Sequence, residues 1–150
     1  MSRVQLALNV GDLDASIDFY TKLFKSPPTK LRDNYANFVI AEPPLKLVLI
    51  AGQGEPGSLN HVGVEVASTD EVAAATERMQ AHGAACDVQE STTCCFAVQD
   101  KVWVSGPEIP WEIYTVLADA EVMQPAAEGD CCPTVNNESS LGATTSSSCC

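Results

Sequence analysis

The sequence predicts an α+β fold in which two βαβββ modules form one cupped, mixed sheet. Three observations support this prediction. The order of one strand, one helix and three strands occurs in residues 3–51 and again in residues 60–117. A Gly- and Pro-containing linker, residues 52–58, separates the two copies. After residue 117 the apolar periodicity stops. We therefore expect one domain over residues 1–119 and a tail over residues 120–150.

The first module opens with a strand whose side chains alternate between apolar and other types over residues 4–10, as in a half-buried strand. Asp12 or Asp14 can cap a helix whose apolar residues recur at helical spacing. The Ser-Pro-Pro sequence at residues 26–28 ends that helix. Three short strands are then expected over residues 29–32, 36–41 and 45–51.

The second module repeats this pattern. Residues 61–66 alternate as the first strand does, and residues 68–71 are typical of a helix start. That helix is expected to reach Gly83. Further strands are predicted over residues 85–89, 96–104 and 111–117.

The tail differs in composition from both modules. The stretch after residue 117 contains five acids, no Lys or Arg, and a Ser/Thr-rich run over residues 139–148. Such a segment has little apolar surface to bury, so we expect it to be disordered.

The charge balance of 8 Lys+Arg against 20 Asp+Glu gives a formal net charge of -12. This disfavours nucleic acid or an anionic membrane as a partner, and it favours a small molecule or a protein. No apolar run approaches the roughly 20 residues that span a bilayer, and the first ten residues lack the features of a signal peptide. We expect a cytoplasmic protein, either a monomer or a homodimer.

The seven cysteines include three adjacent pairs, Cys94/Cys95, Cys131/Cys132 and Cys149/Cys150, with Cys86 alone. An odd count without an export signal fits reduced, metal- or metalloid-binding thiols better than a disulfide framework. Neighbouring side chains of a flat strand point to opposite faces, so Cys94 and Cys95 can hold one atom only where the backbone bends. The alternative is that both are ordinary packing residues.

Three polar residues are expected to share the concave face of the sheet. Gln5 and His61 occupy corresponding positions in the two modules, each opposite the apolar face that meets a helix. Glu112 lies between Trp111 and Ile113 and faces away from the helix side as well. Each of the three, taken alone, also fits an ordinary polar residue of a strand.

The paired modules resemble the vicinal oxygen shield superfamily of glyoxalases, extradiol dioxygenases and antibiotic-resistance proteins. The likeness covers residues 3–117 and is strongest in the first strand and helix, residues 8–24. Three shorter motifs resemble the ArsI organoarsenical lyases, also labelled cadmium-inducible proteins. These motifs are Asn-His-Val-Gly at residues 60–63, Cys-Cys-Phe at residues 94–96 and Pro-Trp-Glu-Ile-Tyr at residues 110–114.

The superfamily resemblance implies a metal in the cup, held by Gln5, His61 and Glu112. Aligning Pro44-Leu45-Lys46 with Pro110-Trp111-Glu112 places Lys46 at the fourth ligand position, where a cation cannot bind a metal. The three-ligand set resembles the facial triad of non-haem Fe(II) oxygenases, with Gln5 in place of one His.

The ArsI resemblance implies a non-haem Fe(II)-dependent, dioxygenase-type lyase that uses O2 to cleave the carbon–arsenic bond of trivalent organoarsenicals. Methylarsenite would give arsenite, with Cys94 and Cys95 binding the substrate arsenic. Trp103, Trp111 and Tyr114 are candidates for an aromatic wall, although Trp111 also fits packing under the sheet. Two other functions remain open: thiol-based sequestration of arsenite or cadmium without catalysis, and a glyoxalase-like, metal-dependent isomerase.

Overall fold

The computed structural model describes residues 1–123, and its elements follow the predicted order. The predicted tail lies outside the described residues from residue 124 onward. The first module contains β1 (Arg3–Val10), α1 (Leu13–Phe24), β2 (Lys30–Arg32), β3 (Tyr35–Ile40) and β4 (Leu45–Ala51). The second contains β5 (Leu59–Glu65), α2 (Thr69–Ala81), β6 (Cys86–Cys94), β7 (Ala97–Val104) and β8 (Trp111–Asp119). The predicted α+β fold with two βαβββ modules is confirmed.

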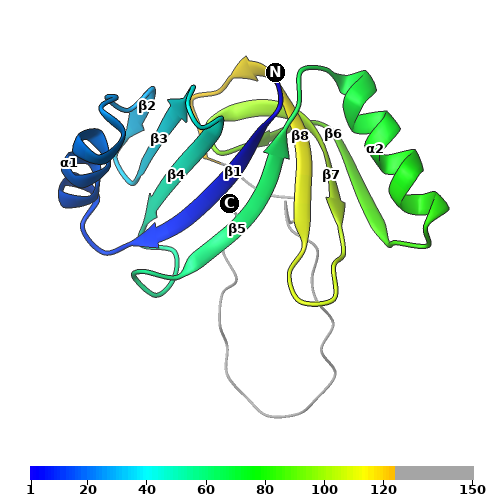
Figure 1. Cartoon of the computed structure of the whole chain (residues 1–150), viewed down its shortest axis with the longest axis horizontal. Helices are drawn as coiled ribbons and strands as arrows, with labels where there is room; N and C mark the ends of the chain where they lie inside the picture. The colour runs from blue at the N-terminus through cyan, green and yellow to red at the C-terminus, as the bar shows by residue number, and fades with distance from the viewer. Residues whose placement is uncertain (124–150) are drawn as a thin grey trace, which may run out of the picture.

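All eight strands form one curved sheet in the order β2-β3-β4-β1-β5-β8-β7-β6 (Figure 1). β1 and β5 are antiparallel neighbours at its centre, and they join the two modules. Within each module the first and last strands are parallel, β1 with β4 and β5 with β8. This mixed pairing brings the first and last strands of both modules next to one another.

The two helices cover the same face of the sheet near its two ends (Figure 1). α1 packs on an apolar cluster of the first module that includes Phe38 and Leu49, both fully buried. α2 packs through Val72 on Val102 and Val104. Because side chains alternate along a strand, the residues between these core positions face the opposite, concave side.

Capping fixes the helix starts at the positions the sequence indicates. The side chain of Asp12 accepts a hydrogen bond from the backbone N–H of Ala15, so Asp12 rather than Asp14 is the N-cap of α1. Ser68 caps α2 in the same way. Neither helix within residues 1–123 is long and apolar enough to cross a membrane.

Candidate active site

Polar residues from the central strands meet on the concave face of the sheet. In the β1–β5 ladder, Gln5 lies opposite Gly63 and Ala7 lies opposite His61. In the β5–β8 ladder, Gly63 pairs with Glu112. Their shared parity places the side chains of Gln5, His61 and Glu112 on the face away from both helices. The structure therefore brings together the three residues that the sequence analysis grouped.

The polar ends of these three side chains lie within hydrogen-bonding range of one another. The Nε2 atom of Gln5 is 2.6 Å from Glu112 Oε1 and 3.0 Å from His61 Nε2. His61 Nε2 is 3.3 Å from Glu112 Oε1. All three residues are buried, with at most 9 % of their surface exposed. The site is shielded from bulk water, so its charges interact strongly.

This spacing suits a metal ion bound on three adjacent positions. Ligand bonds of about 2.1 Å at right angles place neighbouring donor atoms about 3.0 Å apart. The described residues hold no cluster of three His, Cys, Asp or Glu side chains. An imidazole, a carboxylate and an amide oxygen are therefore the donors available here.

Gly63 provides the space in which the Glu112 side chain lies. A Cβ atom added at Gly63 would lie 2.6 Å from Glu112 Cγ and 3.3 Å from Glu112 Oε1. Real Cβ atoms essentially never come within 3.0 Å of another side chain, so any other residue at this position would force the Glu112 side chain to shift.

A buried lysine holds the second oxygen of Glu112. Lys101, which is 1 % exposed, lies in β7 with its Nζ 3.1 Å from Glu112 Oε2. Burial by itself raises the pKa of the Glu112 carboxyl, but the charge of Lys101, helped by the contact with His61, outweighs burial, so the pKa lies well below the ordinary range. Glu112 is therefore ionised at neutral pH, with Oε1 directed toward the other two residues.

A chain of side-chain hydrogen bonds orients His61. Ser58 Oγ accepts from Asn9 Nδ2 at 2.8 Å, and Asn9 Oδ1 accepts from Asn60 Nδ2 at 2.8 Å. The side-chain oxygen of Asn60, Oδ1, lies 2.8 Å from His61 Nδ1. His61 therefore carries its proton on Nδ1, and the lone pair of Nε2 points toward Gln5 and Glu112, as a metal ligand requires.

A second chain of hydrogen bonds holds Gln5. The hydroxyl of Tyr114 contacts Gln5 Oε1 and lies 3.1 Å from Glu65 Oε2, which also accepts from Lys46 Nζ at 2.7 Å. Burial raises the pKa of Tyr114 well above its ordinary value, so the phenol stays protonated. For Glu65 burial raises the pKa, but Lys46, Tyr114 and Arg3 lower it below its ordinary value.

The strand register corrects the sequence alignment that placed Lys46 at the fourth ligand position. Leu6 pairs with Leu47 in β4, whereas the corresponding Val62 pairs with Trp111 in β8. Glu112 therefore corresponds to Val48, a buried aliphatic residue, and Lys46 lies two residues earlier on the same face. The expectation that this position offers no fourth ligand holds, with a valine in place of a cation.

The predicted bend at the cysteine pair is a two-residue turn. β6 ends at Cys94, β7 begins at Ala97, and these two residues pair across the hairpin. Cys95 and Phe96 both have positive φ, 55° and 60°. A type I′ hairpin turn requires such angles, which residues other than Gly rarely adopt. The two sulfur atoms lie 3.3 Å apart. Cys95 is half-buried, and Cys94 is disulfide-bonded.

Segments distant in the sequence hold this turn. Lys30 Nζ donates to the carbonyl of Phe96 at 2.8 Å, and the Phe96 ring packs on Tyr35 with centroids 5.3 Å apart. The backbone N–H of Cys95 donates to the carbonyl of Met123 at 2.8 Å. The strained turn of the second module therefore rests on the first module and on residues 120–123.

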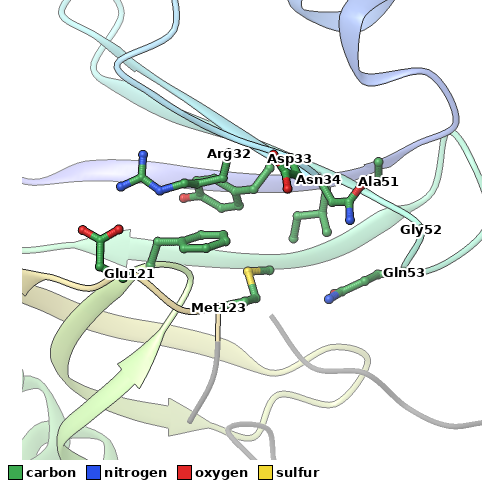
Figure 2. A pocket seen from close by; sticks show the side chains of 11 residues that line it. Arg32, Asp33, Asn34, Ala51, Gly52, Gln53, Glu121 and Met123 are labelled. Atoms are coloured by element: carbon green, nitrogen blue, oxygen red, sulfur yellow. The ribbon is translucent and has the colours of Figure 1, made fainter. Parts of the chain in front are cut away.

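The turn and two of the three clustered residues open on the same space. A cavity of about 240 Å³ is lined by Cys95 together with Gln5 and Glu112. A second cavity of about 570 Å³ is lined by Phe96 of the turn together with Arg32 of β2 and Met123 (Figure 2). A molecule bound to Cys95 therefore shares a cavity with Gln5 and Glu112.

The predicted aromatic wall is divided between the two faces of the sheet. Trp103 and Tyr114 are buried on the concave face, and Trp103 lies edge-on to His61 with ring centroids 5.8 Å apart. Trp111 lies on the opposite face and is 40 % exposed. Sequence reasoning missed Lys101 and Glu65. Lys101 lies two residues before Trp103 in β7, so the alternation of side chains places both on the same face of the sheet.

Comparisons with known proteins agree with this architecture. Residues 3–107 match the model of the Glyoxalase/Bleomycin resistance protein/Dioxygenase superfamily. The trivalent organoarsenical cleaving enzyme of Thermomonospora curvata is 53% identical over all of both chains. The cadmium-induced protein CadI of Mycobacterium tuberculosis is 57% identical over 81% of this chain and 80% of its own. A probable trivalent organoarsenical cleaving enzyme of Bacillus subtilis is 34% identical over all of both chains.

Solved structures with low sequence identity share the fold. An extradiol ring-cleaving dioxygenase from B. fuscum has a TM-score of 0.56 and 20% identity over 79% of this chain. The matched region is only 34% of that dioxygenase chain, so this protein spans about a third of its length. A Mn(II)-bound glyoxalase from Novosphingobium aromaticivorans has a TM-score of 0.57 and 17% identity, over 85% of this chain and 44% of its own.

Proposed function

The chain belongs to the Glyoxalase/Bleomycin resistance protein/Dioxygenase superfamily and, within it, to the family of trivalent organoarsenical cleaving enzymes, and we propose that it cleaves carbon–arsenic bonds. The proposed substrates are trivalent organoarsenicals such as methylarsenite, and the co-substrate is dioxygen. One methylarsenite and one dioxygen give one arsenite and one formaldehyde. Both oxygen atoms are consumed, the carbon is oxidised, and arsenic stays trivalent, so the reaction needs no further reductant.

The observation that carries this proposal is the convergence of three polar side chains on the buried concave face, with Gln5 Nε2, His61 Nε2 and Glu112 Oε1 2.6 to 3.3 Å apart. Gln5, His61 and Glu112 would hold Fe(II) through Oε1, Nε2 and Oε1, respectively. Bound Fe(II) would supply the centre at which dioxygen is activated. Among residues 1–123, these three side chains are the donors at that point, because Val48 stands at the remaining corresponding position. Coordination positions are therefore left for exogenous molecules.

Cys94 and Cys95 are proposed to bind the substrate through arsenic. A trivalent arsenic that carries one organic group has two exchangeable positions, and two thiolates fill both. Thiolate sulfur is a soft donor that matches arsenic better than oxygen donors do. The sulfur atoms lie 3.3 Å apart at the two-residue turn, and Cys95 lines the cavity that Gln5 and Glu112 also line. Because Cys94 is disulfide-bonded, this use requires that its disulfide be reduced first.

The shared cavity connects the two halves of the proposed site. Cys95 lines the same 240 Å³ space as Gln5 and Glu112, so an arsenical on the turn has its organic group within the enclosure of the metal ligands. Holding two reactants in one enclosure removes much of the entropic cost of their encounter. Lys101 and Tyr114 contribute indirectly, since they fix the side chains of Glu112 and Gln5.

Each alternative leaves part of the site unexplained. Sequestration of arsenite or cadmium needs the cysteines, but it gives no role to the buried cluster of Gln5, His61 and Glu112. A glyoxalase-like isomerase would use a fuller set of metal ligands, and Val48 occupies the position where a fourth would stand.

Oxygen consumption with methylarsenite separates these functions. Reduced protein loaded with Fe(II) should consume dioxygen and release arsenite in a one-to-one ratio, whereas metal-free protein should bind methylarsenite without turnover. Arsenical binding with no oxygen uptake in the Fe(II)-loaded protein would favour sequestration. Conversion of a 2-oxoaldehyde–thiol adduct without oxygen uptake would favour the isomerase.

A further inference from the structure

The side-chain amide of Gln5 has two orientations that fill nearly the same space. In the structure Nε2 faces Glu112 and His61, and Oε1 contacts the Tyr114 hydroxyl. Only the amide oxygen has lone pairs for a metal, because the amide nitrogen is a hydrogen-bond donor. A half-turn of the amide exchanges the two atoms and directs Oε1 toward His61 and Glu112. Binding a metal through Gln5 therefore requires this second orientation.

The surroundings of the Tyr114 hydroxyl favour that second orientation. The hydroxyl has one hydrogen, yet its two neighbours in the described orientation, Gln5 Oε1 and Glu65 Oε2, are both acceptors. After the half-turn, Gln5 Nε2 donates to the phenol oxygen and the phenol hydrogen goes to Glu65. The Tyr114 hydroxyl then donates to one neighbour and accepts from the other, as buried polar groups strongly favour, and the lone pairs of Gln5 Oε1, His61 Nε2 and Glu112 Oε1 face one another, as a bound cation requires.

Glu65 is fixed in the form that this arrangement needs. Lys46 donates to Glu65 Oε2 at 2.7 Å, and the Arg3 guanidinium lies 3.4 Å from Glu65 Oε1. Two cations therefore hold Glu65 as a carboxylate, which only accepts hydrogen bonds. An acceptor at this position orients the phenol hydrogen away from Gln5. The phenol oxygen is then left to accept from the amide nitrogen.

We propose that Tyr114 is the positioning residue that holds the Gln5 amide with Oε1 directed toward His61 and Glu112, and that Glu65 orients the Tyr114 hydroxyl. This inference rests on the proposed function, because it takes Gln5 as a metal ligand. An amide is a weaker ligand than an imidazole, so fixing its orientation reduces the cost of using it. The relation is the amide counterpart of the hydrogen bonds that orient metal-binding histidines.

Anaerobic titration with Fe(II) against a chromophoric chelator tests this role without measuring activity. Tyr114→Phe should lower Fe(II) affinity by about 10- to 100-fold, as loss of such partners does elsewhere. Tyr35→Phe is the matched control. Tyr35 is equally buried on the same face, but its hydroxyl accepts from Asn37 and contacts none of the three proposed ligands. Its removal should leave the affinity unchanged, and an equal loss in both variants would overturn the inference.

A double-mutant cycle separates positioning from a general structural role. If Tyr114 acts through the amide, Tyr114→Phe should cause no further loss of Fe(II) affinity in a Gln5→Ala background. The same loss in both backgrounds would show that Tyr114 supports the fold rather than Gln5. Glu65→Gln, which removes the fixed acceptor while keeping the side-chain size, should cause a smaller loss in the same direction.

The absorption spectrum of Co(II)-loaded protein provides a second readout. Tyr114→Phe should alter the ligand-field bands as Gln5→Ala does, because both remove the oriented amide oxygen, whereas Tyr35→Phe should leave them unchanged. Wild-type affinity and spectrum in Tyr114→Phe would overturn the inference, whatever the activity. If the protein binds Fe(II) with the expected dependence on Tyr114 yet consumes no oxygen with methylarsenite, the proposed function fails and this inference stands.

Discussion

Lys101 and Glu112 form an ion pair inside the sheet, with Lys101 Nζ 3.1 Å from Glu112 Oε2 and the other carboxylate oxygen directed toward His61. Lys101→Met should destabilise the metal-free protein by about 3–5 kcal/mol, because it leaves a buried carboxylate without its cation. Urea unfolding measures this change. Adding Glu112→Gln should restore much of the loss. Lys22→Met, which breaks an exposed pair with Asp18, should change stability by less than about 1 kcal/mol.

The chain contains two histidines, and only one lies in the proposed site. His61→Ala should abolish Fe(II) binding and oxygen consumption, because it removes a proposed metal donor. It should leave methylarsenite bound to the reduced thiols, because it does not change Cys94 or Cys95. Metal titration and arsenic analysis after gel filtration measure the two properties separately. His82→Ala, at the exposed end of α2, is the control and should retain both. Oxygen consumption by His61→Ala would rule out the iron mechanism.

Substitution at the cysteine turn should have the opposite effect. Cys94→Ser or Cys95→Ser should abolish methylarsenite binding in reducing buffer and keep wild-type Fe(II) affinity, since a hydroxyl does not replace a soft thiolate toward arsenic. Cys86→Ser is a suitable control, because Cys86 is a free thiol on the other end of β6. Normal turnover in both turn variants would show that other cysteines bind the substrate.

Gly63→Ala should weaken the site through sterics alone. The added methyl group would lie 2.6 Å from Glu112 Cγ, so the carboxylate must shift. We expect a loss of stability of about 1–3 kcal/mol, as in other overpacked interiors, together with weaker metal binding. Gly11→Ala provides a milder comparison, because its methyl group would meet only the Pro56 ring at 3.2 Å. Equal effects at both glycines would argue against a special role for Gly63.

The Glu65 carboxylate predicts a pH dependence of stability. Its pKa in the folded protein lies below the ordinary value of 4.5, so its ionised form stabilises the fold. That contribution is fully present above pH 4.5 and is lost as the pH falls through the folded-state pKa. Urea unfolding at a series of pH values should show a flatter acid limb for Glu65→Gln than for the wild type. Glu77→Gln, on the exposed side of α2, should retain the wild-type profile.

Much of the fold could be predicted because both modules follow one pattern of alternation and turns. The same alternation placed Gln5, His61 and Glu112 on one face. It could not settle whether Lys46 or Val48 corresponds to Glu112. Strand side chains repeat every two residues, so a shift by two keeps every residue on its face and leaves the pattern unchanged. Only the hydrogen-bonded register distinguishes the two alignments.

The rest of the site depends on contacts between distant segments. β6 extends to Cys94 although residues 90–93 are polar, because β7 pairs with it along most of its length around a bulge. Nothing local in the sequence indicates that Lys30 would support the turn at Phe96. Lys101 was overlooked for a related reason, since an isolated lysine in a strand is usually solvated and its partner Glu112 lies on another strand.

The pairing of β1 with β5 gives the cup an approximate two-fold axis that passes between Leu6 and Val62. Two identical modules about such an axis would present equivalent donors in pairs. Here Gln5 is equivalent to His61, so that pair keeps its polar character with different chemistry, whereas Glu112 is equivalent to Val48 and that pair is broken. Because both modules lie in one chain, the sequence of each can change independently of the other. A nearly symmetric sheet therefore carries an asymmetric site, with the Glu112 carboxylate on one side and the apolar Val48 on the other.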